Sequence, residues 1–276
     1  MRVVRFVVSL VIFSLAATAG ADAFYDVPIV TQVQGAAFYR TSLAISNVGP
    51  RSFLAITFLY RSPVDNTMQH PVYVQTALET SAVFSSDDIV QFFKTSSDMR
   101  AADKTVSLFG SLSIELPDIA DPSDVSIVAR TYSPGPTGTG TMGIAYLGRP
   151  NGTTTRAFSR MTTTVRNGAF GQDGSARANI GILNLSNFAI DLKVEYKNAA
   201  NGAAVKTFNL STVIGHLLES HEVVQLNNIF GDAALSSVSR VVVTVTPIAP
   251  AQSFTGYAVQ LDNTTNDGSF FLMTER

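Results

Sequence analysis

The feature that most constrains this chain is an internal duplication in which both copies carry the same alternation of apolar side chains. The segment Arg40–Asn47 matches Arg177–Asn184: each begins with Arg, ends with Asn and has large apolar residues at the same alternate positions. Self-similarity of this kind is the signature of a repeated structural unit. We therefore expect the chain to contain two copies of one fold unit.

The segments that follow indicate what kind of unit is repeated. Successive side chains of a strand point to opposite faces, so a strand with one face on a core alternates apolar and polar residues. Asp191, Lys193 and Glu195 fill the intervening positions of the second copy and predict a charged outer face. The alternating apolar residues are Leu54, Ile56, Phe58 and Tyr60 in the first copy and, with one turn residue deleted, Ile190, Leu192, Val194 and Tyr196 in the second.

Further matches extend the duplication. Val83–Ile89 resembles Val223–Ile229, and each reads as a strand end that enters a single helical turn, with Asp87 and Asn227 as the capping residues. Two later matches pair Val125–Ala129 with Val241–Val245 and Gly143–Ala145 with Gly256–Ala258.

Short strand segments at even spacing, separated by turn residues and without a long helix, predict an all-β fold. We expect two tandem antiparallel β-sandwich domains of the immunoglobulin-like (Ig-like) kind, with a barrel as the alternative. Domain 1 spans residues 24–150 and domain 2 spans residues 155–276, with the short junction Asn151–Thr154 holding them in a fixed or semi-fixed arrangement. The strands expected in the first domain are Pro28–Val33, Tyr39–Asn47, Phe53–Tyr60, Pro71–Gln75, Ser81–Phe84, Thr105–Glu115, Val125–Tyr132 and Thr141–Leu147.

The first 23 residues have the pattern of a secretory signal peptide. Arg2 and Arg5 precede the apolar run Phe6–Ala17, and either Ala21–Ala23 or Ala19–Ala21 offers a cleavage site. A membrane anchor is the alternative, but a spanning helix needs about 20 apolar residues and this run is shorter. We therefore expect a protein that is secreted, periplasmic or displayed at the cell surface.

Composition limits the partners of such a protein. The chain has no cysteine, which excludes disulfides, thiol chemistry and a lipidated cysteine anchor. Charged residues are only 14% and the net charge is −2, so no overall basic charge favours nucleic acid or anionic lipid. No later stretch is apolar and long enough to span a bilayer, so we expect no integral membrane segment in the mature chain.

Three segments resemble a known group of proteins. They are Phe38–Asn47, the turn Arg130–Gly135 and the late segment Asp262–Asp267. They are similar to parts of uncharacterised secreted bacterial proteins that carry tandem Ig-like β-sandwich repeats. This resemblance implies the same fold and compartment, and it brings no catalytic residues.

Candidate catalytic and zinc-binding residues are few. The histidines are His70, His216 and His221, and we expect them to be solvent-facing loop residues rather than zinc ligands, because no cysteine or paired acidic motif accompanies them. The sequence has no nucleophile elbow, zinc-protease or phosphate-loop motif. A Ser-His-Asp triad stays open, since its members converge only in three dimensions.

Two acidic loops could bind calcium, which takes six to eight oxygen ligands. They contain Asp118, Asp121 and Asp124, and Asp262, Asn263, Asn266 and Asp267. The alternative is an ordinary turn, because Asp and Asn side chains bond to nearby backbone in turns.

Other candidates are repeated or paired residues. The equivalent Arg40 and Arg177 could contact a ligand or brace a neighbouring loop carboxylate or carbonyl. The pairs Phe92–Phe93 and Phe270–Phe271 should each direct one ring outward, where it could stack on a sugar or pack between the domains.

From these patterns we predict a non-catalytic exported module for binding, adhesion or assembly. Its partner would be an unknown protein or glycan at the cell surface, and we assign no catalytic, cofactor-binding or metal-binding residue. Open sandwiches leave edge strands that can accept a strand from a partner. The alternatives are a secreted hydrolase with two facing carboxylates and a structural spacer. An exposed apolar or aromatic patch would favour a binding module over a spacer.

Overall fold

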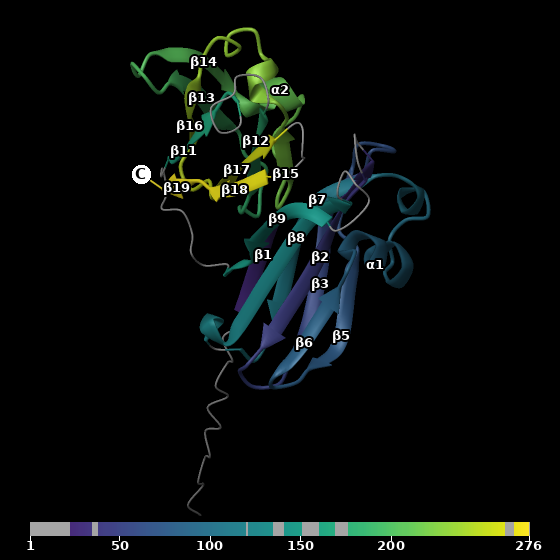
Figure 1. The fold of residues 1–276 in the computed structure, drawn as a ribbon. Coiled ribbons are helices and arrows are strands. Elements are labelled where there is room, and N and C mark those ends of the chain that lie inside the picture. The colour runs from purple at the N-terminus through teal and green to yellow at the C-terminus, as the bar shows by residue number, and fades with distance from the viewer. Residues whose placement is uncertain are drawn as a thin grey trace, which may run out of the picture.

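A computed structural model describes residues 23–34, 38–119, 121–134, 141–150, 160–168, 176–262 and 268–275. The predicted junction Asn151–Thr154 and all of the predicted signal peptide except Ala23 lie outside the described residues. The described part is mostly β-structure, with antiparallel pairing in every sheet (Figure 1). The expectation of an all-β fold is therefore confirmed.

The first half of the molecule, residues 23–150, forms a ten-stranded sheet in which the main order is β4-β3-β7-β1-β2-β8-β9. Three further strands, β5, β6 and β10, pair with β3, β2 and β1. The elements are β1 (Ala23–Gln34), β2 (Phe38–Asn47), β3 (Ser52–Arg61), β4 (Met68–Gln69), β5 (Val72–Leu78), β6 (Ala82–Ser86), α1 (Ile89–Ser96), the 3₁₀-helix η1 (Asp103–Thr105), β7 (Leu108–Leu116), the 3₁₀-helix η2 (Pro122–Asp124), β8 (Val125–Pro134), β9 (Thr141–Leu147) and β10 (Arg149–Pro150).

Strand β1 connects two groups of strands within this sheet. It pairs with β7, its register shifts between Val27 and Val30, and its last residues pair with β2. One group is thus β5-β3-β7-β1 and the other is β6-β2-β8-β9. Both groups contribute side chains to one hydrophobic cluster, which includes Ile56, Leu112 and Ile45.

The second half, residues 160–275, contains a five-stranded sheet, β14-β13-β16-β11-β19, and a four-stranded sheet, β15-β12-β17-β18. Side chains from both sheets form a second cluster, for example Val243 and Ile180. The elements are β11 (Met161–Arg166), β12 (Ala176–Asn184), β13 (Leu192–Asn198), β14 (Ala204–Asn209), α2 (Leu210–Ile214), β15 (Val223–Leu226), the 3₁₀-helix η3 (Ile229–Gly231), β16 (Arg240–Pro247), β17 (Phe254–Asp262), β18 (Gly268–Leu272) and β19 (Thr274–Glu275).

The two halves repeat one strand order. The group β5-β3-β7-β1 corresponds to β14-β13-β16-β11, and β6-β2-β8-β9 corresponds to β15-β12-β17-β18. The predicted matches of β2 with β12, β3 with β13 and β6 with β15 are therefore confirmed. The eight strands expected in the first half are all present as well.

The two later matches are wrong. Val125–Ala129 lies in β8, which pairs with β2, whereas Val241–Val245 lies in β16, which pairs with β13 and β11. The true equivalent of β8 is β17, and that of β9 is β18. Short valine-rich alternations look alike in sequence because alternation reports which face is buried and not which strand is the neighbour.

A duplicated asparagine supports the match of β2 with β12. The buried Asn47 amide donates to the carbonyl oxygens of Pro50, Leu78 and Glu79, and its Oδ1 accepts from Gly49. At the end of β12, Asn184 donates to the carbonyls of Phe188, Leu218 and Glu219, and its Oδ1 accepts from the amide of Ser186. The same side chain therefore ties the same turn in each half.

The predicted faces are also confirmed. Leu54, Ile56 and Phe58 are fully buried, as are Leu192 and Val194, while Ile190 is 1% exposed. The predicted caps are one residue too early. Asp88, not Asp87, caps α1 by accepting from the amide of Gln91, and Asn228, not Asn227, precedes η3 without a side-chain cap.

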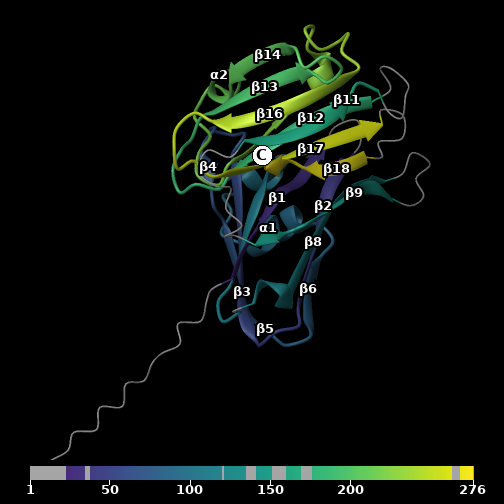
Figure 2. The same cartoon turned by 90° about the vertical axis from the view of Figure 1, so that its left-hand side faces the viewer.

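The halves contact each other through their cores. Leu183, Val223 and Tyr257 of the second half belong to the hydrophobic cluster of the first. The ring of Phe270 stacks between Tyr146 of β9 and Tyr257 of β17, with ring centroids 5.0 and 5.2 Å away. Most strands of the second half run across those of the first (Figure 2).

Within the residues that the structure describes, no helix has the length and apolar character needed to cross a membrane.

Candidate functional site

Strand β5 lies at an edge of the first half, and its pairing with β3 has a register shift between Ser52 and Leu54. It pairs with β3, and no strand pairs with its other side among the described residues. Its sequence, from Val72 to Leu78, contains no charged residue and no proline. Soluble proteins commonly protect edge strands with lysine, proline or a bulge, because a free edge is a template for pairing with another chain.

The hydrogen-bond register shows which backbone groups face outward. Phe58 lies opposite Pro71, and its amide donates to the Pro71 carbonyl oxygen over 3.0 Å. Antiparallel partners alternate between hydrogen-bonded and non-hydrogen-bonded pairs, so Val72 and Val74 direct their N–H and C=O groups away from β3. Thr76 lies at the register shift, where this alternation is interrupted. Val74 therefore offers a donor and an acceptor to a further strand, and Val72 offers an acceptor.

Apolar side chains lie beside this edge on the outer face of the sheet. Val74 is 59% exposed, and Phe53 of β3 is 51% exposed. Val72 is also exposed, and Val74 lies directly opposite Ala55 in the register. We call the outward edge of β5 together with Phe53 the β5 edge.

The inner face of β5 is fixed by an aromatic cluster. The ring of Tyr73 contacts Phe92 of α1 edge-on, with centroids 4.5 Å apart, and lies 6.1 Å from Phe84 of β6. Phe92 in turn contacts Phe93, which is fully buried. The inward side chains therefore hold β5 against the core while its outward side stays accessible.

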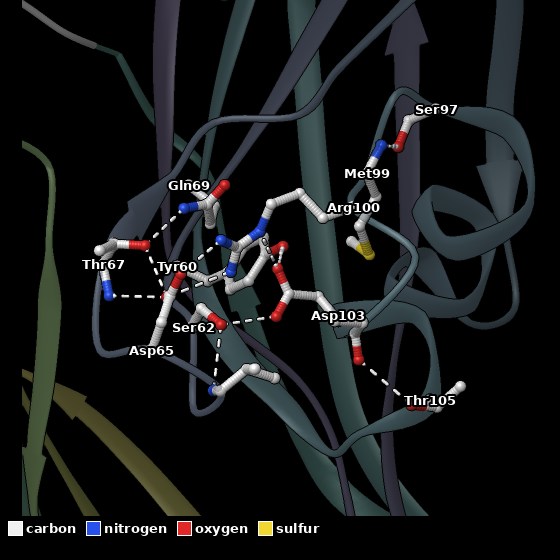
Figure 3. A network of polar contacts seen from close by, with 12 residues as sticks. Tyr60, Ser62, Asp65, Thr67, Gln69, Ser97, Met99, Arg100, Asp103 and Thr105 are labelled. Carbon is white, nitrogen blue, oxygen red and sulfur yellow. Dashed lines mark hydrogen bonds and ion pairs between the residues drawn. The ribbon is translucent and has the colours of Figure 1, made fainter.

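A polar network around Asp103 joins the end of β3 to the loop that precedes β7 (Figure 3). The buried carboxylate of Asp103 accepts from the Tyr60 hydroxyl at 2.8 Å, the Ser62 hydroxyl at 2.5 Å and Arg100 Nε at 2.9 Å. Burial opposes ionisation of Asp103, but these hydrogen bonds outweigh it and lower its pKa. Arg100 also pairs with Asp65 at 2.6 Å.

This network anchors the loop that supplies Asp98. The Asp98 carboxylate accepts from the outward amide of Val72 at 3.2 Å, so the first outward donor of β5 is already occupied. The accessible edge therefore begins at Val74. Because every polar atom of Asp103 is engaged in bracing, we assign the network a positioning role.

A second polar group joins the two halves. The Glu222 carboxylate, only 4% exposed, accepts from Arg61 Nε at 2.6 Å and from a second Arg61 nitrogen at 3.0 Å. It also accepts from the amide of Glu219 and contacts His216 Nε2 at 3.0 Å. Burial opposes ionisation of Glu222, yet these contacts together lower its pKa.

The expectation of solvent-facing histidines holds only for His70. His216 is half-buried against Glu222, and His221 is half-buried with its Nδ1 unpaired. Burial, with the nearby His70, lowers the pKa of His221. Ser111 donates to the backbone oxygen of His221 and not to its ring, and no histidine of the described chain contacts a serine hydroxyl through its ring.

The first acidic loop behaves as a turn. Asp121 accepts from the Ser123 amide and caps η2, and Asp118 has a positive φ of 79°. Asn263, Asn266 and Asp267 of the second loop lie outside the described residues. Where the chain is described, no group of three or more His, Asp or Glu side chains is arranged to hold a metal ion.

The repeated arginines occupy equivalent strand positions. The Arg40 guanidinium lies 4.9 Å from the ring centre of Tyr132, its partner in β8, and Arg177 lies opposite Leu261 at the equivalent place. Within the described residues, Arg40 contacts an aromatic ring and no carboxylate or carbonyl. Phe270 packs between the halves, whereas Phe271 is exposed, which fits the interdomain alternative.

Sequence reasoning expected open edges but did not identify β5. The signal was present in the uncharged, proline-free segment from Val72 to Leu78. Comparison of the chain with protein-family models and with curated proteins finds no match.

Proposed function

We propose that the chain is a non-catalytic exported binding protein that docks a partner at the β5 edge. In this proposal a signal peptide (residues 1–23) precedes two tandem Ig-like β-sandwich domains, residues 24–150 and 155–276. The resemblance to uncharacterised secreted bacterial proteins with such repeats supports the same arrangement. The protein would act in the periplasm, at the cell surface or outside the cell.

The observation that carries this proposal is the combination of outward backbone groups and exposed apolar side chains at the β5 edge. Main-chain hydrogen bonds to an added strand provide affinity, and pockets or patches for alternate side chains provide specificity. The outward groups of Val72 and Val74 lie two residues apart, which matches the spacing of an extended peptide. We therefore propose an extended segment of a surface protein as the partner, in preference to a glycan.

The alternatives have less support. A structural spacer does not require an uncharged edge strand with the exposed apolar side chains of Val74 and Phe53, since both features favour association with another chain. A hydrolase would need two carboxylates that face each other across a cleft. The buried carboxylates of Asp103 and Glu222 are instead saturated by cationic and hydroxyl partners.

Replacement of Val74 by proline tests the docking edge. The amide of Val74 points away from β3, so proline removes an outward donor without removing a bond of the existing ladder. Leu217→Pro, at an exposed loop position of the second half whose amide donates no hydrogen bond among the described residues, is the matched control. The readout is binding of the labelled protein to cells of the source organism and to their extracted surface proteins.

We expect wild type and the Leu217 variant to bind and the Val74 variant to lose binding by at least about tenfold. Circular dichroism spectra of wild type and both variants show whether each protein is folded. Binding by the Val74 variant at the wild-type level, or no binding by wild type to cells or surface proteins, would contradict the proposal.

A further inference from the structure

Two arginines of the second half lie side by side, and no acidic side chain among the described residues pairs with either of them. Arg166, the last residue of β11, is directly opposite Arg240, the first residue of β16. Both side chains are exposed, while their neighbours Val165 and Val241 are fully buried in the core. Neither guanidinium makes an ion pair or hydrogen bond within the described part of the chain.

The backbone geometry brings these two side chains close together. The Asn167 amide donates to the Ser239 carbonyl, so Asn167 and Ser239, the residues that follow Arg166 and precede Arg240, form a hydrogen-bonded pair. The Arg240 carbonyl points the other way and accepts from the Ala199 amide, just beyond β13. Arg166 and Arg240 therefore form a non-hydrogen-bonded pair, the type in which the Cα atoms approach to about 4.5 Å. Like charges directly opposite each other in a sheet are destabilising.

The pair borders a shallow pocket of about 280 Å³. Its other lining residues are neutral, small or amide-bearing, and none is acidic: Asn167, Gly168, Ala199, Ala200 and Ser239. On the outer face of the same sheet, Glu195 is engaged by Lys197 at 3.1 Å. Within the described residues, no acidic side chain compensates the repulsion between the arginines.

We propose that Arg166 and Arg240 form a binding site for a single oxyanion group, a carboxylate, sulfate or phosphate. A guanidinium presents a planar fork of N–H donors that matches the oxygens of such groups, and two forks meet here at one pocket. Ser239 and Asn167 add neutral polar side chains at the rim. The volume lies below the roughly 300–1,000 Å³ of pockets that take drug-sized ligands, which fits one acidic group and not a whole cofactor.

This site is independent of the β5 edge. It lies in the second half, and no residue of the β5 edge lines it. Failure of one proposal therefore leaves the other unaffected.

The test is a titration of the ¹⁵N-labelled protein with sodium sulfate, sodium phosphate or sodium glucuronate. Binding is measured from the chemical shifts of the backbone amides, and chloride keeps the ionic strength constant. The three anions distinguish a tetrahedral oxyanion from a sugar carboxylate. We expect saturable shifts at the amides of Asn167, Ala199 and Ser239 with at least one of them. The double variant R166Q/R240Q should weaken that binding by at least about tenfold, since it removes both charged forks.

Arg160→Gln is the matched control, because Arg160 is exposed and precedes the opposite end of β11. It removes the same charge and should change the affinity by less than about twofold. The single variants R166Q and R240Q replace the double variant if the latter does not fold. Unsaturable, uniform shifts in wild type, or equal affinity in wild type and the Arg166 and Arg240 variants, would overturn the proposal.

Discussion

Glu222→Gln is expected to weaken the contact between the two halves of the molecule. The wild-type carboxylate receives two hydrogen bonds from Arg61, one from the amide of Glu219 and a contact from His216. Glutamine preserves the size of the side chain but removes the charge. It also replaces one acceptor oxygen by an NH₂ group that faces a guanidinium.

The structure sets the size of the effect. Hydrogen bonds to charged groups contribute about 1.5–3 kcal/mol each, and removal of one partner from a buried ion pair costs about 3–5 kcal/mol. The Arg61 side chain is 20% exposed and also donates to the carbonyl of Asn66, so it is not stranded when Glu222 is neutralised. We therefore expect a loss of about 2–3 kcal/mol in the free energy of unfolding at pH 7.

The assay is urea unfolding followed by far-UV circular dichroism, applied to E222Q, R61Q and the double variant. The chain has no tryptophan, so a fluorescence signal would rest on tyrosine alone. Glu79→Gln is the control: Glu79 pairs with Arg51 at 3.0 Å, but both side chains are more than 60% exposed. That exposed pair should contribute no more than about 0.5 kcal/mol.

The pH dependence gives a second readout. Because the pKa of Glu222 is lowered on folding, its contribution is present above the ordinary value of 4.5 and is lost as pH falls through the folded pKa. Wild type should lose more stability than E222Q between pH 7 and acid. Equal losses for E222Q and E79Q, or a double-mutant coupling near zero, would refute the reasoning.

Three further predictions concern the cores. Gly181→Ala would place a Cβ 1.8 Å from Cζ of the buried Tyr257 ring and should cost about 2–3 kcal/mol, measured by urea unfolding. Asn184→Asp should cost about 3 kcal/mol at neutral pH in the same assay, because it directs a charge at three carbonyl oxygens; a cost under about 1 kcal/mol would contradict this. Asp103→Asn should cost about 2 kcal/mol at pH 7. Because the pKa of Asp103 is lowered on folding, the stability difference between wild type and D103N should disappear as pH falls through the pKa of Asp103 in the folded protein. A difference that stays the same in acid would contradict a stabilising ion pair between Asp103 and Arg100.

Much of the fold was predictable from local pattern. The alternation at Leu54–Phe58 identified a strand and its buried face, and the Arg40–Asn47 match identified the duplication, because both are properties of single strands. Asn47 and Asn184, which end the two matched segments, also make equivalent hydrogen bonds. Caps were placed one residue early, since adjacent Asp or Asn residues are equally able to cap.

The choice of neighbouring strands was not predictable in the same way. Val241–Val245 resembles β8 in sequence, yet it became the counterpart of β7, because pairing depends on the packing of the whole core and not on one strand's alternation. The β5 edge is defined only by the side of β5 that no described strand pairs with. Its uncharged composition is visible in the sequence, but its exposure is not.

The sequence by itself determined the strands, their buried faces and the twofold repetition, since an alternation of apolar side chains acts within a few residues. Only the tertiary structure decided that Arg61 meets Glu222, 161 positions away, and that Arg166 lies directly opposite Arg240. Such juxtapositions follow from strand register, which is set by the free energy of the complete sheet and core.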